Sequence, residues 1–194
     1  MIHTIGDSHS TRTFVGIPGV VVHHLGPVTM NRIGRPEEPL LANAVAAIKL
    51  TPADVLIFCF GEIDARVHIK IQTEYRKLEE VVGDLVVRYL DRVALLNSQG
   101  ARRVVLSVTP PTTTQRAYNF DVPVEGTDGE RVHYTRRLNQ LLAEGCHKRG
   151  LTFLDVYPEY ADPNGMLLVP LADECVHIKD TSRVRKVMQG MGFL

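Results

Sequence analysis

The feature that most constrains the fold is a run of six apolar residues at positions 55–60, VLIFCF, which is closed by Gly61. A continuous apolar run of this length is typical of a strand buried on both faces, as in the centre of a parallel sheet. Three other short apolar segments, residues 2–5, 103–108 and 152–156, are separated from it by segments that favour helices. This alternation predicts an α/β fold with a mainly parallel sheet.

The remaining predicted elements complete the pattern. A further strand is expected at residues 20–24, and helices are expected at residues 39–49, 73–98, 131–149 and 181–188. The second of these helices has apolar side chains at three- and four-residue steps. Residues 112–130 lack periodicity and are expected to form a long surface loop, a kind of segment that is often functional. Residues 1–194 are therefore predicted to fold as one domain with about five strands.

Composition excludes several classes of protein. Lys and Arg together number 22, as do Asp and Glu. This balance gives no electrostatic footprint for nucleic acid or for an anionic membrane. No apolar run approaches the ~18 residues of a membrane helix, and residues 1–14 lack the pattern of a secretory signal. The widely spaced Cys59, Cys146 and Cys175 form neither a disulfide framework nor a metal-binding pair, so a reducing, cytoplasmic location is predicted.

A first polar motif, GDSHS at residues 6–10, directly follows the first predicted strand. In open α/β sheets, ligands bind beyond the carboxyl ends of the strands, so Ser8 is expected at the edge of a site. The alternative is that Asp7 or Ser8 caps the next helix, and this alternative is preferred for the motif taken alone.

A second motif, FGEIDAR at residues 60–66, ends the most buried predicted strand. Glu62, Asp64 and Arg66 need solvent, a partner or a substrate there, because lone buried charges are unfavourable. The alternative is a helix that begins here with acidic residues in its first turn.

A third motif, DECVH at residues 173–177, lies near the C-terminus. A carboxylate three or four residues before a histidine can orient the imidazole while the other ring nitrogen faces a nucleophile. The alternative is a polar surface turn. A metal site is disfavoured, because no companion cluster with ligand spacing occurs elsewhere in the sequence.

Taken together and in this order, the motifs resemble those of the SGNH (GDSL-type) hydrolase family. In that family a GDS block follows the first strand, a glycine follows the second, a GxND block follows the third, and DxxH lies near the C-terminus. The corresponding residues here are 6–8, Gly26, 61–64 and 174–177. The resemblance implies a three-layer α/β/α sandwich with a flavodoxin-like sheet, and it implies no metal or organic cofactor.

The resemblance also implies roles for individual residues. Ser8 would be the nucleophile, and His177 the general base that removes its proton. The orienting carboxylate of the family lies three residues before the histidine, at Glu174 here. Asp173, one residue earlier, is the competing candidate, and the spacing favours Glu174.

The oxyanion hole departs from the family pattern. The backbone N–H groups of Ser8 and Gly26 would supply two donors, but Ile63 occupies the position of the third, an asparagine. Losing one oxyanion donor typically lowers turnover by about 10²–10³. Arg66 is the favoured replacement, since it lies about one helical turn further on and carries fixed donors.

Several alternatives remain for these residues. Arg66 would favour an acidic substrate, or it would instead form a salt bridge with Glu62 or Asp64. Asn31 is a second candidate donor, and His68 is close enough in sequence to reach the site.

The function predicted is a serine esterase that forms an acyl-enzyme from a small-molecule ester. The resemblance favours a small acyl group, such as acetyl on a carbohydrate or a related small molecule. Two alternatives remain: an O-acyltransferase, in which a sugar hydroxyl resolves the acyl-enzyme, and a binding domain that kept the cleft but lost activity. The oligomeric state is left open.

Overall fold

The computed structural model describes residues 1–120 and 122–194 and contains a five-stranded parallel sheet in the order β2-β1-β3-β4-β5. The strands are β1 (Ile2–Gly6), β2 (Val20–His24), β3 (Val55–Cys59), β4 (Arg102–Leu106) and β5 (Thr152–Leu154). All five predicted strands are therefore confirmed, and the sheet order is the flavodoxin-like one.

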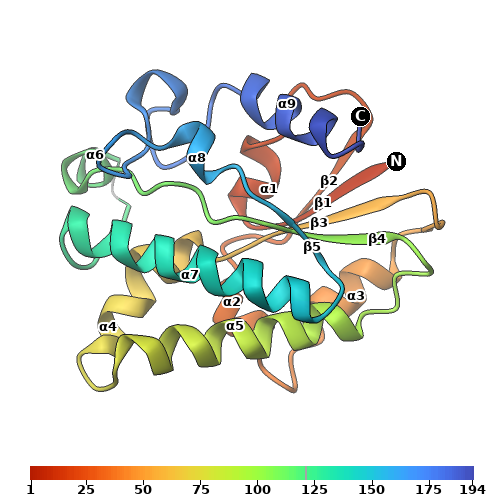
Figure 1. Ribbon diagram of the computed structural model, residues 1–194, viewed down its shortest axis with the longest axis horizontal. Coiled ribbons are helices and arrows are strands. Elements are labelled where there is room, and N and C mark those ends of the chain that lie inside the picture. The colour runs from red at the N-terminus through yellow and green to blue at the C-terminus, as the bar shows by residue number, and fades with distance from the viewer. Residues whose placement is uncertain (121) are drawn as a thin grey trace.

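Helices cover both faces of this sheet. They are α1 (Ser8–Arg12), α2 (Met30–Ile33), α3 (Leu40–Ala46), the π-helical turn η1 (Asp64–His68), α4 (Ile69–Thr73), α5 (Leu78–Leu95), α6 (Thr114–Asn119), α7 (Asp128–Lys148), α8 (Tyr157–Tyr160), the 3₁₀ turn η2 (Val169–Leu171) and α9 (Ser182–Gly190). Figure 1 shows α2, α3, α5 and α7 on one face and α1, α8 and α9 on the other. The predicted three-layer α/β/α sandwich is confirmed. None of the helices in the described ranges is both long and apolar enough to cross a membrane.

The central strand β3 explains how both layers are held. Its side chains alternate between two apolar cores: Leu56 and Phe58 pack with α5 and α7, whereas Ile57 and Cys59 pack with the residues of α8 and α9. All five β3 residues are buried. A strand in this position has no solvated face, which is why its sequence is continuously apolar rather than alternating.

Two predicted boundaries are wrong. The helix expected at residues 73–98 is α5, which begins later and ends earlier, at Leu78–Leu95, while α4 already ends at Thr73. The loop expected at residues 112–130 contains α6 and the first turn of α7. Helix α7 begins early because Thr127 and Glu130 form a capping box, in which each side chain accepts from the other's backbone N–H. The short helices were not predicted, because four or five residues are too few to show a helical period.

The carboxyl ends of β1 and β3 approach each other closely at Gly6. A Cβ added to Gly6 would overlap the carbonyl oxygen of Cys59, the residue paired with it across the two strands. Glycine is therefore required for the strands to remain paired up to the point where the chain turns into α1.

This close approach predicts that Gly6→Ala destabilises the protein by about 1–3 kcal/mol, because backbone atoms would have to move. Gly83→Ala in α5 is the matched control, since its Cβ would meet nothing within 4 Å. There the free energy of unfolding is expected to rise by roughly 0.5–1 kcal/mol, from the better helix propensity of alanine. Urea unfolding of both variants measures the difference, and a Gly6→Ala protein as stable as the unmodified one would contradict the argument.

Candidate active site

Ser8 lies where β1 ends and α1 begins, at the carboxyl edge of the sheet. Asp7 is the N-cap of α1, and its Oδ1 accepts a hydrogen bond of 2.9 Å from the His9 amide. The Asp7 amide donates to the Cys59 carbonyl at 3.2 Å. The capping alternative for this motif is therefore correct for Asp7, and the capped turn also fixes the position of the serine beside it.

The ring of His177 joins Ser8 to Asp173. His177 Nε2 lies 2.8 Å from Ser8 Oγ, and His177 Nδ1 lies 2.7 Å from Asp173 Oδ2. The first distance agrees with the hydrogen-bond contact expected between a serine nucleophile and its base. The three side chains have the connectivity of a Ser–His–Asp triad.

The preference for Glu174 as the orienting carboxylate is wrong. The Glu174 side chain is exposed, and its backbone carbonyl accepts a hydrogen bond of 3.3 Å from Arg116 Nε. Residues 173–177 form a bend in which Asp173 Oδ1 accepts from the amides of Cys175, at 2.8 Å, and His177, at 3.0 Å. These bonds turn the Asp173 carboxylate toward the ring, so the four-residue spacing is the relevant one here.

The environment of Asp173 favours its ionised form. Partial burial raises its pKa, but hydrogen bonds from the amide and ring of His177 outweigh this effect and lower the pKa below its ordinary value. An ionised carboxylate can accept the proton of Nδ1–H, which leaves Nε2 as the ring nitrogen that accepts from Ser8.

Ser8 and His177 open into a cleft of about 300 Å³. The cleft is lined by Ser8, His24, Pro27, Glu62, Ile63, Arg66, Val122, Cys175, Val176 and His177. Glu62 and Arg66 are thus brought to Ser8 as the sequence predicted. Cys175 also lies at the cleft, and burial raises the pKa of its thiol, which disfavours a reactive thiolate.

Arg66 forms the salt bridge that was its alternative role. Its Nε donates to Glu62 Oε1 at 2.7 Å, and its Nη1 donates to the Pro123 carbonyl. Both partners of the ion pair have side chains that are only 11% exposed. The carboxylate offsets the guanidinium charge at the cleft wall, which weakens the expectation of an acidic substrate.

Three of the predicted site residues face another cavity. Asn31, Asp64 and His68 line a cavity of about 150 Å³ beside α4 and α5, and Ser8 is not part of its lining. Asn31 Oδ1 accepts from Arg88 at 3.0 Å. These three side chains are therefore not among the residues that line the Ser8 cleft, and their contact with the oxyanion or the substrate stays a prediction.

Asp64 instead holds the N-terminus of α2. Its carboxylate accepts from the amides of Met30, at 2.6 Å, and Asn31, at 3.1 Å. Burial raises the pKa of Asp64 to about 6 although these amides lower it. The acidic residue is explained by a structural contact with a neighbouring helix rather than by substrate binding.

Gly26 and Ile63, the two other positions of the predicted oxyanion hole, lie at or next to the cleft wall. Gly26 has φ of +81°, a left-handed conformation that favours glycine, and it lies between two residues of the cleft wall, His24 and Pro27. Ile63 lines the cleft, so the family's asparagine position presents an apolar side chain there.

His9 is a neighbour of the site to which the sequence gave no role. Its side chain is buried, and its ring centroid lies 4.9 Å from that of His177. Burial, followed by the charge of His177, lowers the pKa of His9 well below its ordinary value. His9 is thus a neutral packing surface for the ring of His177. Its position on the first turn of a helix that follows a buried strand was the available signal.

Comparisons with known proteins bear on the fold. No protein-family model matches the chain, and no curated protein matches it in sequence. Among solved structures, a GDSL-like lipase from Bacteroides thetaiotaomicron is similar, with a TM-score of 0.56 and 12% identity over 97% of this chain and 83% of that chain. A carbohydrate acetylesterase from Sinorhizobium meliloti has a TM-score of 0.58 and 13% identity, over 98% of this chain and 95% of its own. An aryl esterase from M. smegmatis has a TM-score of 0.56 and 17% identity, over 100% of this chain and 99% of its own.

These similarities, together with the sheet order and the GDS turn, define the class of fold. The chain has the SGNH (GDSL-type) hydrolase fold. Identities this low show the fold alone, and one fold can support different reactions.

The buried Asp7 carboxyl predicts an unusual pH dependence of stability. Burial raises its pKa from 3.8 to about 8, so the folded state keeps a proton that the unfolded state loses between those values. The titration of Asp7 therefore lowers the free energy of unfolding as the pH rises from about 4 to 8. Asp7→Asn removes the titration and keeps an acceptor for the His9 amide. As the pH rises over this range, the free energy of unfolding of the variant should therefore increase relative to that of the unmodified protein, by about 1 kcal/mol or more.

Urea unfolding from pH 4 to 8 measures this gain. Asp180→Asn is a control, because hydrogen bonds from Ser182 lower the pKa of Asp180 below its ordinary value of 3.8. Both its folded and its unfolded state are therefore ionised over most of this range, and the stability of that variant relative to the unmodified protein should stay nearly constant from pH 4 to 8. Parallel curves for the unmodified protein and Asp7→Asn would show that Asp7 is ionised in the folded state.

Proposed function

We propose that this chain is a serine esterase in which Ser8 is the nucleophile, His177 is the general base and Asp173 orients His177. The single observation that carries the proposal is the continuous hydrogen-bonded chain from Asp173 through His177 to Ser8, with distances of 2.7 and 2.8 Å, at the edge of a cleft. Neither a capping serine nor a surface turn requires such an arrangement.

The proposed reaction has two halves. Ser8 Oγ attacks the ester carbonyl carbon while His177 Nε2 takes the hydroxyl proton, and Asp173 stabilises the imidazolium. The tetrahedral intermediate collapses, the proton passes from Nε2 to the leaving alkoxide, and the alcohol departs from an acyl-enzyme. Water then gives a proton to the same nitrogen and attacks the acyl carbon. The bond between this carbon and Ser8 Oγ breaks, the proton passes from Nε2 to Oγ, and the acid is released.

The oxyanion is proposed to bind the N–H groups of Ser8 and Gly26 together with Arg66. A guanidinium has five N–H donors. Two of those on Arg66 are used by Glu62 and Pro123, and within the described residues the others have no hydrogen-bonded protein partner. These remaining donors support Arg66 as the replacement for the amide that Ile63 does not supply.

The proposed substrate is a small, uncharged ester of a carbohydrate or an aryl alcohol. Two observations support this choice: the charge of Arg66 is offset by Glu62, and the similar structures include a carbohydrate acetylesterase and an aryl esterase. A cleft of about 300 Å³ suits a small acyl group. We also infer a reducing compartment such as the cytoplasm, because all three cysteines are free.

The identity of the orienting carboxylate gives the first test. With p-nitrophenyl acetate as substrate, Asp173→Asn should lower kcat by up to about 10⁴, because the amide no longer fixes the required tautomer of His177. Glu174→Gln is the matched control, equal in charge change and one residue away, and it should retain kcat within a few-fold. Ser8→Ala defines the background rate. Greater damage from the Glu174 variant would contradict the assignment of Asp173.

The role of Arg66 gives the second test. Arg66→Gln should lower kcat on the same ester by about 10²–10³, the effect of losing one oxyanion donor. Glu62→Gln is the control, since it breaks the same ion pair but retains the guanidinium, and it should lose much less. Equal losses in both variants would mean that the ion pair supports the cleft wall and that Arg66 does not bind the oxyanion. An unmodified protein no faster than Ser8→Ala would instead support the binding-domain alternative.

A further inference from the structure

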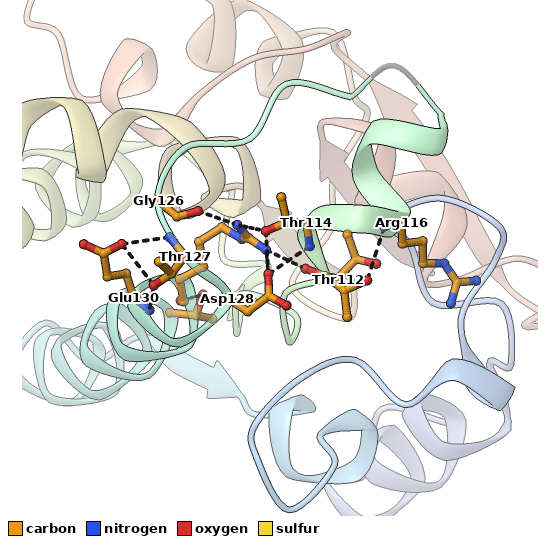
Figure 2. A network of polar contacts seen from close by, with 10 residues as sticks. Thr112, Thr114, Arg116, Gly126, Thr127, Asp128 and Glu130 are labelled. Atoms are coloured by element: carbon orange, nitrogen blue, oxygen red, sulfur yellow. Dashed lines mark hydrogen bonds and ion pairs between the residues drawn. The ribbon is translucent and has the colours of Figure 1, made fainter.

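The segment between β4 and α7 is anchored at both ends by one buried arginine of α7. Arg131 is 1% exposed, and its guanidinium donates to the carbonyls of Thr112 and Gly126, each at 3.0 Å. It also donates to Thr114 Oγ1 at 3.1 Å and to Asp128 Oδ1 at 2.6 Å. Figure 2 shows this network, which brings the two ends of the segment together beside the first turn of α7.

The same network sets the position of α6. Asp128 Oδ1 accepts from both the amide and the hydroxyl of Thr114, at 2.8 and 2.6 Å. Thr113 caps the helix by accepting from the Arg116 amide at 3.2 Å. Arg116 therefore projects from a helix whose start is fixed by the network of Asp128 and the buried Arg131 (Figure 2). A side chain on such a helix can hold a partner in place.

The partner of Arg116 is the loop that carries Asp173 and His177. Its Nη2 donates to the Asp173 carbonyl, and its Nε donates to the Glu174 carbonyl at 3.3 Å. Residues 173–177 lie outside any helix or strand and are flanked by the isolated bridge between Ala172 and Ile178. The loop is thus fixed mainly by its own hydrogen bonds and by these contacts with the guanidinium.

We propose that Arg116 is a positioning residue for the active site: it holds the backbone at Asp173 and Glu174 so that Asp173 Oδ2 stays in contact with His177 Nδ1. The inference rests on the proposed function, in which the carboxylate of Asp173 orients His177 as the catalytic base. Arg116 would act through Asp173, since it is not among the described residues that line the cleft. A misplacement of about 1 Å by a change remote from the chemistry can lower a rate by 10²-fold.

The opposite wall of the cleft is held by the same segment through different residues. Arg66 donates through Nη1 to the Pro123 carbonyl, and the Glu125 amide donates to the Arg66 carbonyl at 2.9 Å. Val122 is part of the cleft lining. Among the described residues, the hydrogen bonds of the Arg116 guanidinium all go to the Asp173 side of the cleft. Its removal should therefore change kcat without changing the KM for a small ester.

The experiment compares Arg116→Gln and Arg116→Lys with Arg103→Gln. Arg103 is the matched control, because its guanidinium also donates to two consecutive carbonyls, those of Val93 and Ala94, but at the end of α5 away from the cleft. The readouts are kcat and KM for p-nitrophenyl acetate, the thermal midpoint, and the low-field proton NMR signal of His177 Nδ1–H, assigned by its loss in Asp173→Asn.

We expect Arg116→Gln to lower kcat by about 10- to 10²-fold with KM within about two-fold, and to shift or broaden the His177 signal. Arg116→Lys should recover part of both effects. Arg103→Gln should lower the thermal midpoint comparably while kcat and the signal stay unchanged. An unchanged kcat and signal in Arg116→Gln, or equal losses in Arg103→Gln, would overturn the proposal.

The NMR readout separates this inference from the proposed function. If the unmodified protein has no esterase activity, the proposed function fails, but a signal that changes in Arg116→Gln and not in Arg103→Gln still supports the positioning role. A signal that is absent from the unmodified protein would mean that Asp173 and His177 are not held together, which overturns the inference.

Discussion

The hydrogen bond between Ser8 Oγ and His177 Nε2 joins residues 169 positions apart in the chain. Because the five strands are parallel, the turn after β1, with Ser8, lies at the carboxyl edge of the sheet, and the chain beyond β5 reaches it there. The approach of β1 to β3 at Gly6 fixes one end of this bond. The bend at residues 173–177, with its contacts to Arg116, fixes the other.

The carboxyl groups around Ser8 and His177 differ because their surroundings differ. Asp7, the residue before Ser8, is buried, and burial raises its pKa to about 8. Asp173 accepts hydrogen bonds from two amides and a ring, and its pKa is lowered. Carboxyl groups whose environments separate their pKa values in this way can have different roles at one pH. Here the neutral group supports a turn, and the charged group is suited to orient a base.

The sequence predicted the sheet well because each strand carries its own signal. Continuous apolar residues identified β3, and glycine or proline bounded β2. The contact between Ser8 and His177 was expected from the resemblance to the SGNH family, whereas strand geometry alone placed only Ser8 at the edge of a site. The helices inside residues 112–130 were not predicted, because α6 is short and because Thr127 and Glu130, which form the capping box of α7, precede the helix expected at residues 131–149.

Side-chain direction could not be predicted in the same way. Glu174 and Asp173 are neighbours in sequence, and only the bend determines which carboxylate meets the ring. Asp64 and Arg66 are two positions apart in one helical turn and line different cavities. The contacts of Arg116 with the Asp173 loop join residues 57 and 58 positions apart without a sequence pattern that would indicate them.

The central claim is that His177 activates Ser8 as a nucleophile. The most direct measurement is labelling with a fluorophosphonate probe, followed by mass spectrometry of the modified peptide. The structure predicts one adduct on Ser8 and its loss in His177→Ala, because a hydroxyl without its base is a weak nucleophile. A folded protein that the probe does not label, or equal labelling of the His177 variant, would contradict the claim.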